Sequence, residues 1–192
     1  MLGKGFSSMI GKVLEKKGCI LLVQSRHPVA VFGAYSASAW YKSAQFYGDE
    51  DGHGCSVFSL SPAARYFSTT GFNQNFQYLG SGCTSGINPN GLGLGGQVKN
   101  FALFLDESLD FGHSYPSATF NNLQLHHGDS PTFEIETIEV WCPTKEALVE
   151  EGEAKKGILQ NEKFKADKHI LVSLLPSLFS FPQPRTEKLR RC

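Results

Sequence analysis

The fold class is decided by one short stretch, Phe133-Glu-Ile-Glu-Thr-Ile-Glu-Val-Trp141, in which apolar and polar side chains alternate. Alternation with a period of two is typical of a β-strand, because successive side chains point to opposite faces of a sheet. The apolar residues change parity between Ile135 and Ile138. This change indicates either a β-bulge at Glu136-Thr137 or a strand that is buried on both faces.

Short apolar runs separated by turn-forming residues fill the region from Phe46 to Trp141. Glycine, asparagine and proline cluster between the runs and predict turns. Because the region lacks the pattern of a helical crossover, its strands are expected to pair antiparallel. The predicted strands are Cys55–Leu60, Arg65–Ser68, Phe76–Leu79, Gly93–Gly96, Phe101–Asp106 and Phe133–Trp141.

The first part of the chain predicts a helix followed by a hairpin. Apolar residues recur at helical spacing from Phe6 to Leu14, and Gly18 then breaks the pattern. The apolar runs Cys19–Val23 and Val29–Tyr35 flank a proline-containing turn and predict paired strands. The fold class expected is mostly β, an antiparallel two-sheet β-sandwich with flanking helices at its ends.

The composition changes after Trp141, and this change sets the expected domain organisation. The charged stretch Pro143–Lys156 and the apolar periodicity from Phe164 to Leu175 each predict a helix. Residues 177–192 end in a cluster of basic residues and predict a flexible tail. We therefore expect a domain at residues 1–143, a C-terminal helical extension at 144–176 and a basic tail at 177–192.

Charge and composition exclude several classes of protein. The 192 residues include 18 Lys+Arg and 18 Asp+Glu, so the formal net charge is zero and a nucleic-acid binder is not expected. No apolar run reaches the roughly 18 residues of a transmembrane helix. The five cysteines are widely spaced, and their odd count predicts free thiols in a reducing, cytoplasmic compartment.

Cofactor and metal motifs are weak. The run Gly91-Leu-Gly-Leu-Gly-Gly96 fits the dinucleotide pattern, but that pattern needs a helix after it, and Val98–Leu105 predicts a strand instead. The six histidines lack the spacing of a zinc site, and the adjacent His126 and His127 would point to opposite faces of a strand. We expect no cofactor and no metal.

A catalytic alternative rests on a few polar residues. His113 and Ser114 could act as base and nucleophile with Glu139, or a reactive cysteine could handle peroxide. Adjacent residues seldom meet in the required hydrogen-bond geometry, and serine and histidine commonly stabilise loops. The residues alone therefore favour a protein without an active site.

An ordered set of motifs resembles the TLDc domain family. The set includes Val31-Phe-Gly-Ala-Tyr35, Phe46-Tyr-Gly-Asp49, Phe101-x-Leu-Phe-Leu-Asp106, Gly112-His-Ser114 and Glu139-Val-Trp141, in the family's order, from about Gly5 to Trp141. The residues that carry the resemblance and are expected to support the fold are Gly33, Trp40, Gly48, Gly71, Gly95, Gly96, Asp106, Gly112, Ser114, Glu139 and Trp141.

The resemblance implies a β-sandwich flanked by helices and no established reaction. It further implies oxidative-stress protection and binding of the cytosolic subunits of the vacuolar proton-pumping ATPase. The segment Asn88–Gln97 resembles a lysosomal, mTOR-associated subgroup, which implies mTOR pathway partners and a peripheral place on lysosomal membranes. Family domains usually carry a segment before the helix near Gly5, so the resemblance also implies N-terminal truncation.

The predicted C-terminal helix offers an expected partner-binding surface. An apolar helix can dock in a partner's groove, or it can pack on the domain's own sandwich, and the sequence leaves both readings open. A stress-protective adaptor with a different partner would have the same sequence features. The residues expected to bind a partner are Phe164, His169, Ile170, Leu171 and Leu174.

Overall fold

The computed structural model describes residues 5–48, 54–82, 89–97, 99–143 and 159–162. Strands dominate this part of the chain, and it contains a single short helix. The elements are α1 (Phe6–Val13), β1 (Cys19–Ser25), β2 (Ala30–Ser36), β3 (Ser43–Tyr47), β4 (Cys55–Ser61), β5 (Arg65–Ser68), β6 (Gln77–Gly80), β7 (Gly91–Leu94), β8 (Leu103–Asp106), β9 (Phe111–His113), β10 (Thr132–Pro143) and β11 (Leu159–Glu162).

All strand pairs are antiparallel, and they form one continuous sheet in the order β3-β6-β7-β8-β9-β10-β1-β2-β4-β5, with β11 also paired to β10. The expected mostly-β antiparallel fold is confirmed. The sheet is not divided into two, because the long strand β10 belongs to both halves. Its beginning pairs with β9 at Phe133 and Gly112, and its later part pairs with β1.

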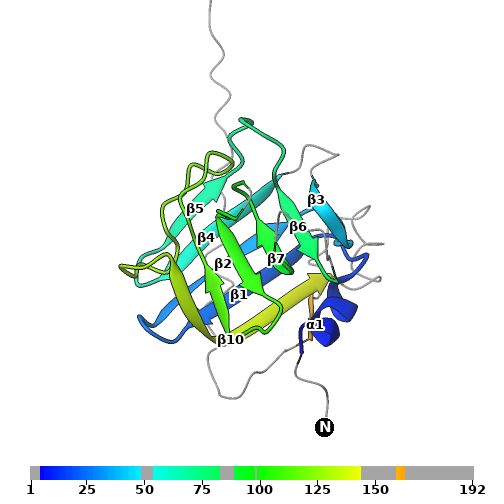
Figure 1. The fold of residues 1–192 in the computed structure, drawn as a ribbon, viewed down its shortest axis with the longest axis horizontal. Coiled ribbons are helices and arrows are strands. Elements are labelled where there is room, and N and C mark those ends of the chain that lie inside the picture. Colours follow the sequence, from blue (N-terminus) through cyan, green and yellow to red (C-terminus); the bar gives the residue numbers. More distant parts are fainter. Residues whose placement is uncertain (1–4, 49–53, 83–88, 98, 144–158, 163–192) are drawn as a thin grey trace, which may run out of the picture.

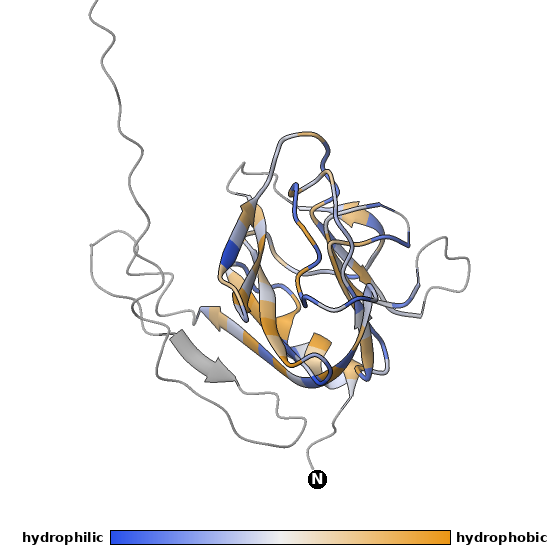
Figure 2. Ribbon diagram, turned by 90° about the vertical axis from the view of Figure 1, so that its left-hand side faces the viewer, coloured by the Kyte–Doolittle hydropathy of each residue, from blue (hydrophilic) through white to orange (hydrophobic). Residues whose placement is uncertain are grey.

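The sheet folds over so that its two halves face each other. Figure 1 shows β6 and β7 overlying the layer of β1, β2 and β4. Leu92 and Leu94 of β7 line the same internal cavity as Leu21 of β1. Phe32 of β2 meets Phe133 of β10 edge to face, with ring centroids 4.9 Å apart. Apolar and polar residues alternate along several of these strands (Figure 2), as expected when one face is buried.

The strand β10 contains the bulge that its sequence pattern indicates. Gln24 lies opposite Thr137, and the next residue, Ser25, lies opposite Ile135. Glu136 is therefore the extra residue, and its carboxylate accepts a hydrogen bond of 2.7 Å from Nε of Arg26. The bulge explains why Phe133 and Ile138 are both buried although they differ in parity.

The N-terminal helix and hairpin are confirmed. Helix α1 buries Phe6, Met9, Ile10 and Val13, which share one face at helical spacing. The hairpin of β1 and β2 is in regular register from Cys19 opposite Ser36 to Ser25 opposite Ala30.

The other predicted strands are present with shifted ends. The Gly-rich strand is Gly91–Leu94 instead of Gly93–Gly96, and the next strand begins at Leu103, so the strand predicted at Val98–Leu105 is too long. Gln97 and Asn100 exchange backbone hydrogen bonds in a tight turn between the two strands. The apolar residues on either side hide this turn in the sequence pattern. Three short strands, β3, β9 and β11, are absent from the predicted set, because none has a clear apolar alternation.

The predictions for the C-terminal part fall mainly outside the described residues. The expected partner-binding residues Phe164, His169, Ile170, Leu171 and Leu174, and the basic tail at 177–192, all lie there. Within the extension predicted at residues 144–176, the described residues Leu159–Glu162 form β11, which pairs with Val140–Pro143 of β10. The division of the chain at residues 143 and 176 stays a prediction.

Candidate functional site

The glycines of the family motifs allow close approach between strands. A Cβ on Gly33 would collide with the carbonyl oxygen of Leu21 on the neighbouring strand, and one on Gly95 would enter the ring of Phe120. Gly96 has φ of 89°, which favours glycine, and a Cβ there would meet the Asn100 carbonyl. These motif positions are explained by packing.

The remaining motif residues also serve the architecture. Trp40 is buried. Asp106 Oδ1 accepts a 2.8 Å hydrogen bond from Ser108 Oγ in the turn between β8 and β9. Trp141 donates its Nε1 hydrogen to Glu139 Oε2 at 3.2 Å. The other motif glycines lie at the end of β3 (Gly48), in the loop after β5 (Gly71) and on β9 opposite Phe133 (Gly112).

The catalytic alternative of Ser114, His113 and Glu139 does not come together. Ser114 is fully buried; its Oγ donates to the Ala102 carbonyl at 2.7 Å and accepts from the Leu125 amide at 3.0 Å. His113 stacks on Phe104, with ring centroids 4.9 Å apart. Within the described part of the chain, no hydrogen bond joins any two of the three residues.

Ser114 therefore has a structural task that can be measured. We expect Ser114→Ala to lower the free energy of unfolding by about 1–3 kcal/mol, because a buried amide and a buried carbonyl lose their partner. Chemical denaturation of both proteins measures the difference. The matched control is Ser108→Ala, which removes an exposed hydroxyl and should cost less than about 0.5 kcal/mol. Equal losses in the two variants would contradict the structural role.

The stability of the fold depends on pH because His113 is largely buried. Burial disfavours the charged imidazolium and lowers the pKa of His113 from 6.5 to about 4. The unfolded chain takes up this proton at the higher pH, so stability that is present above pH 6.5 is lost as the pH falls towards 4. Burial also lowers the pKa of His126, which acts in the same direction.

We expect His113→Phe to lose less of its thermal stability than the wild type between about pH 7 and pH 5. Phenylalanine keeps a ring against Phe104 but does not titrate. Circular dichroism melting curves across this pH range measure the slope, and His27→Phe, in the exposed β1–β2 turn, is the control. An unchanged slope in His113→Phe would show that this ring does not carry the effect.

One serine–histidine contact was not anticipated from the sequence. His127 Nε2 lies 3.0 Å from Ser59 Oγ, which itself donates to the Ala63 carbonyl at 2.5 Å. Because the serine hydrogen is used in that bond, His127 Nε2 must be the donor and is not a base for Ser59. His126 and His127 lie in the loop between β9 and β10, not on a strand. In the described ranges, no group of three His, Cys, Asp or Glu side chains could hold a metal.

The feature that could take part in a chemical reaction is a disulfide between Cys19 and Cys142. Cys19 begins β1 and Cys142 lies near the end of β10, where Ile20 is opposite Trp141, so the register makes the two cysteines neighbours. Their Cα atoms are 4.3 Å apart, and 123 residues separate them in the sequence. The expectation of free thiols is wrong for this pair, because spacing along the chain does not show which strands are adjacent.

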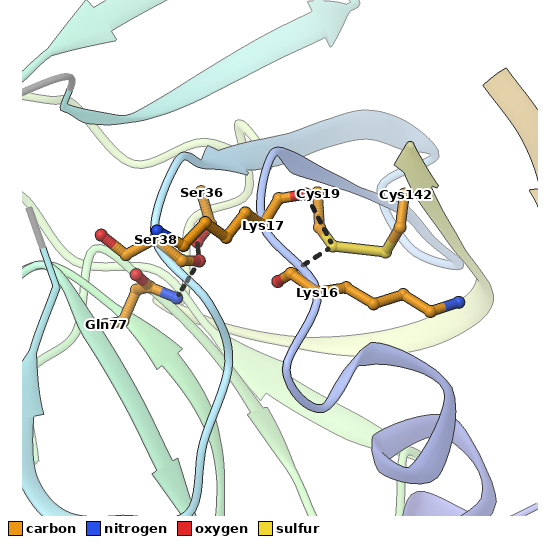
Figure 3. Close-up of a disulfide and its surroundings, with 7 residues drawn as sticks. All are labelled: Lys16, Lys17, Cys19, Ser36, Ser38, Gln77 and Cys142. Carbon is orange, nitrogen blue, oxygen red and sulfur yellow. Dashed lines mark hydrogen bonds between the residues drawn. A yellow bond between two sulfur atoms is a disulfide. The ribbon is translucent and has the colours of Figure 1, made fainter. Parts of the chain in front are cut away.

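The disulfide stands in a buried row that crosses four strands. Cys19 pairs with Ser36 on β2, and Ser36 pairs with Cys55 on β4. Ser36 Oγ and Gln77 Nε2 both donate to the Ser38 carbonyl, at 3.0 and 3.4 Å (Figure 3). The Cys55 thiol donates a weak hydrogen bond to Gln77 Oε1, with 3.9 Å between sulfur and oxygen. Two strand spacings, about 10 Å, separate Cys55 from Cys19, too far for thiol exchange.

Two backbone carbonyls and a cavity adjoin the sulfur of Cys19. Cys19 Sγ lies 3.7 Å from the oxygen of Lys16 and 4.0 Å from that of Lys17 (Figure 3). On its inner side is a cavity of about 10 Å³, lined mainly by apolar side chains, among them Val13 and Trp40. This volume is at the lower limit for one water molecule.

Comparison with known proteins gives the family. The sequence profile of the TLDc domain matches residues 1–143. This match covers most of the 192 residues, and the chain belongs to the TLDc domain family. The resemblance inferred from the motifs is confirmed.

Curated relatives carry two kinds of name. The MTOR-associated protein MEAK7 of Xenopus laevis is 37% identical over 143 residues, which are 73% of this chain and 29% of that protein. MEAK7 of Danio rerio is 36% identical over 165 residues, 83% of this chain and 34% of that protein. Oxidation resistance protein 1 of Yarrowia lipolytica is 33% identical over 66% of this chain and 50% of that protein. The chain thus spans about a third of the length of the MEAK7 relatives.

The residues that the structure describes contain no helix with the length and apolarity needed to cross a bilayer.

Proposed function

We propose that this chain is a non-enzymatic TLDc module that acts by binding other proteins. Its partners are the cytosolic subunits of the vacuolar proton-pumping ATPase, and its role lies in oxidative-stress protection and lysosomal mTOR signalling. The family match and the names of the relatives, MTOR-associated and oxidation resistance proteins, support the mTOR and oxidative-stress parts of this proposal. The ATPase partner is what the resemblance to TLDc proteins implies. Its place is the cytoplasm and, peripherally, the lysosomal membrane.

The proposal that the module is not an enzyme is supported by what the motif residues do in the fold. Gly33 and Gly95 permit close packing, and Ser114 bonds backbone groups. In an enzyme, the residues that mark the family would be expected to meet at a pocket with their polar atoms available. The arrangement supports a scaffold that presents a surface.

The surface proposed for the partner consists of Phe164, His169, Ile170, Leu171 and Leu174, all apolar except the histidine. In the sequence, this set follows Leu159–Glu162, which forms β11 and pairs with the end of β10. The experiment is a pull-down from cell lysate with the full 192-residue chain, followed by quantitative mass spectrometry. We expect ATPase subunits to be enriched over the doubly substituted Leu171→Asp, Leu174→Asp chain.

The same experiment separates the remaining readings. Equal recovery of ATPase subunits with both chains would show that these leucines are not the binding surface. Enrichment of another protein without any ATPase subunit would contradict the ATPase proposal and favour an adaptor with a different partner. Circular dichroism of both chains is the control, because the substitutions must leave the β-sheet spectrum unchanged.

A further inference from the structure

We propose that Cys19 and Cys142 form a reversible thiol–disulfide site, oxidised by hydrogen peroxide and reduced by a dithiol. This inference goes beyond the proposed function, because it concerns the domain itself and needs no partner. The pair is the one place in the described residues where two cysteines meet. Both cysteines are buried on adjacent strands, and the backbone register of these strands places them side by side.

The surroundings of Cys19 fit the reduced state as well as the oxidised one. In the disulfide, the sulfur has no hydrogen to give to the carbonyls of Lys16 and Lys17. A thiol at the same position would have the Lys16 oxygen within reach as an acceptor, at 3.7 Å. Two thiols also need more space than a disulfide because they must stand at van der Waals distance, and the cavity beside Cys19 offers it.

Exposure distinguishes the roles of the two sulfurs. Both cysteines are buried, and Cys142, with 9% of its surface exposed against 2% for Cys19, is the one that the proposal assigns to the reaction with peroxide. The Cys142 thiolate attacks one oxygen of hydrogen peroxide, giving a sulfenic acid and, after protonation, water. The Cys19 thiol then attacks the sulfenic sulfur, forms the disulfide and releases a second water. Two thiols and one peroxide thus give one disulfide and two waters.

Reduction runs through thiol–disulfide exchange. A thiolate of an external dithiol attacks the sulfur of Cys142, and Cys19 leaves as the thiolate and is protonated. The second thiol of the reductant then attacks its own sulfur in the mixed disulfide and releases Cys142 as a thiol. The reductant ends as a disulfide, so atoms and electrons balance.

The oxidation state of the two cysteines is expected to change how firmly the end of β10 is held between β1 and β11. Cys142 lies opposite Gln160 of β11, while its sulfur ties the same strand to β1. In the oxidised state, the disulfide fixes the end of β10 covalently to β1, while β11 is held to β10 by backbone pairing. In the reduced state, this covalent link is missing and the end of β10 is held by backbone pairing and packing alone, so amides of β11 are expected to exchange with solvent faster.

The test uses the purified 192-residue chain, first reduced with dithiothreitol and then freed of it. After stoichiometric hydrogen peroxide, we expect loss of two of the five thiols and a peptide pair joining Cys19 to Cys142 in a non-reducing digest. Dithiothreitol added to the native protein should restore both thiols. Hydrogen-exchange mass spectrometry should show slower exchange of residues 140–143 and 159–162 in the oxidised chain.

Variants decide between the reversible site and its alternatives. Cys142→Ser should keep its remaining thiols under the same peroxide dose, and Cys55→Ser should still form the Cys19–Cys142 bond. In Cys19→Ser, dimedone should trap a sulfenic acid at Cys142. Peroxide that leaves both cysteines reduced, or a native disulfide that dithiothreitol cannot open, would overturn the proposal. Neither outcome would bear on binding to the ATPase.

Discussion

Gly33→Ala should prevent the domain from reaching its native fold. The added Cβ would sit inside van der Waals contact of the Leu21 carbonyl oxygen and 3.0 Å from the ring of Phe58. The oxygen belongs to a strand that is paired on both sides, so it cannot move away without breaking ladder bonds. We expect a loss of at least about 3 kcal/mol, and aggregated protein instead of a monomer in size-exclusion chromatography.

The matched control is the same substitution in the helix, Gly11→Ala. A Cβ at Gly11 meets nothing within 4 Å. Because alanine favours the helix over glycine, this variant should gain up to about 1 kcal/mol. The two variants differ only in position, so a similar stability for both would mean that β1 and β2 do not pair as closely as the structure shows.

Cys142→Ala should remove about 4 kcal/mol of stability from the oxidised protein. The disulfide closes a loop of 123 residues, and cross-linking so distant positions restricts the unfolded chain strongly. Urea denaturation without reductant measures the loss. The wild type in dithiothreitol should fall towards the variant, whereas dithiothreitol should hardly change the stability of the variant itself.

A double-mutant cycle shows whether the two sulfurs act as one bond. Cys19→Ala alone should cost about as much as Cys142→Ala, and the double variant should cost little more than either. Fully additive losses would mean that each cysteine contributes only its own packing. That result would contradict a disulfide in the folded protein.

Local patterns predicted most elements of the fold, because their information lies within a few residues. The alternation in Phe133–Trp141 predicted the strand β10, and its change of parity offered the bulge as one of two explanations. The helical spacing from Phe6 gave α1. The three-residue strand β9 is too short to show such a pattern. It forms by pairing with β8 on one side, where His113 is opposite Phe104, and with β10 on the other, where Gly112 is opposite Phe133. It could be found only once those neighbours were placed.

The candidate site depends on strand register, which one sequence does not show. Cys19 begins one predicted strand and Cys142 directly follows another, and nothing marks the two as a pair until β1 and β10 are aligned. The same holds for Ser59 and His127, which meet across a loop. By contrast, Gly33 and Ser114 could be singled out from the family resemblance, although only the structure gives their packing and bonding roles.

The shared strand β10 has a consequence for synthesis on the ribosome. It is made after β1 to β9, yet it joins the N-terminal hairpin to the β6–β9 half. Neither half can close its core until residues 132–143 have left the exit tunnel, because both expose the edge that this strand covers. Nascent chains of this domain must therefore wait with an open sheet edge on each half. Assembly is then completed in a single late step, dominated by contacts between distant parts of the sequence.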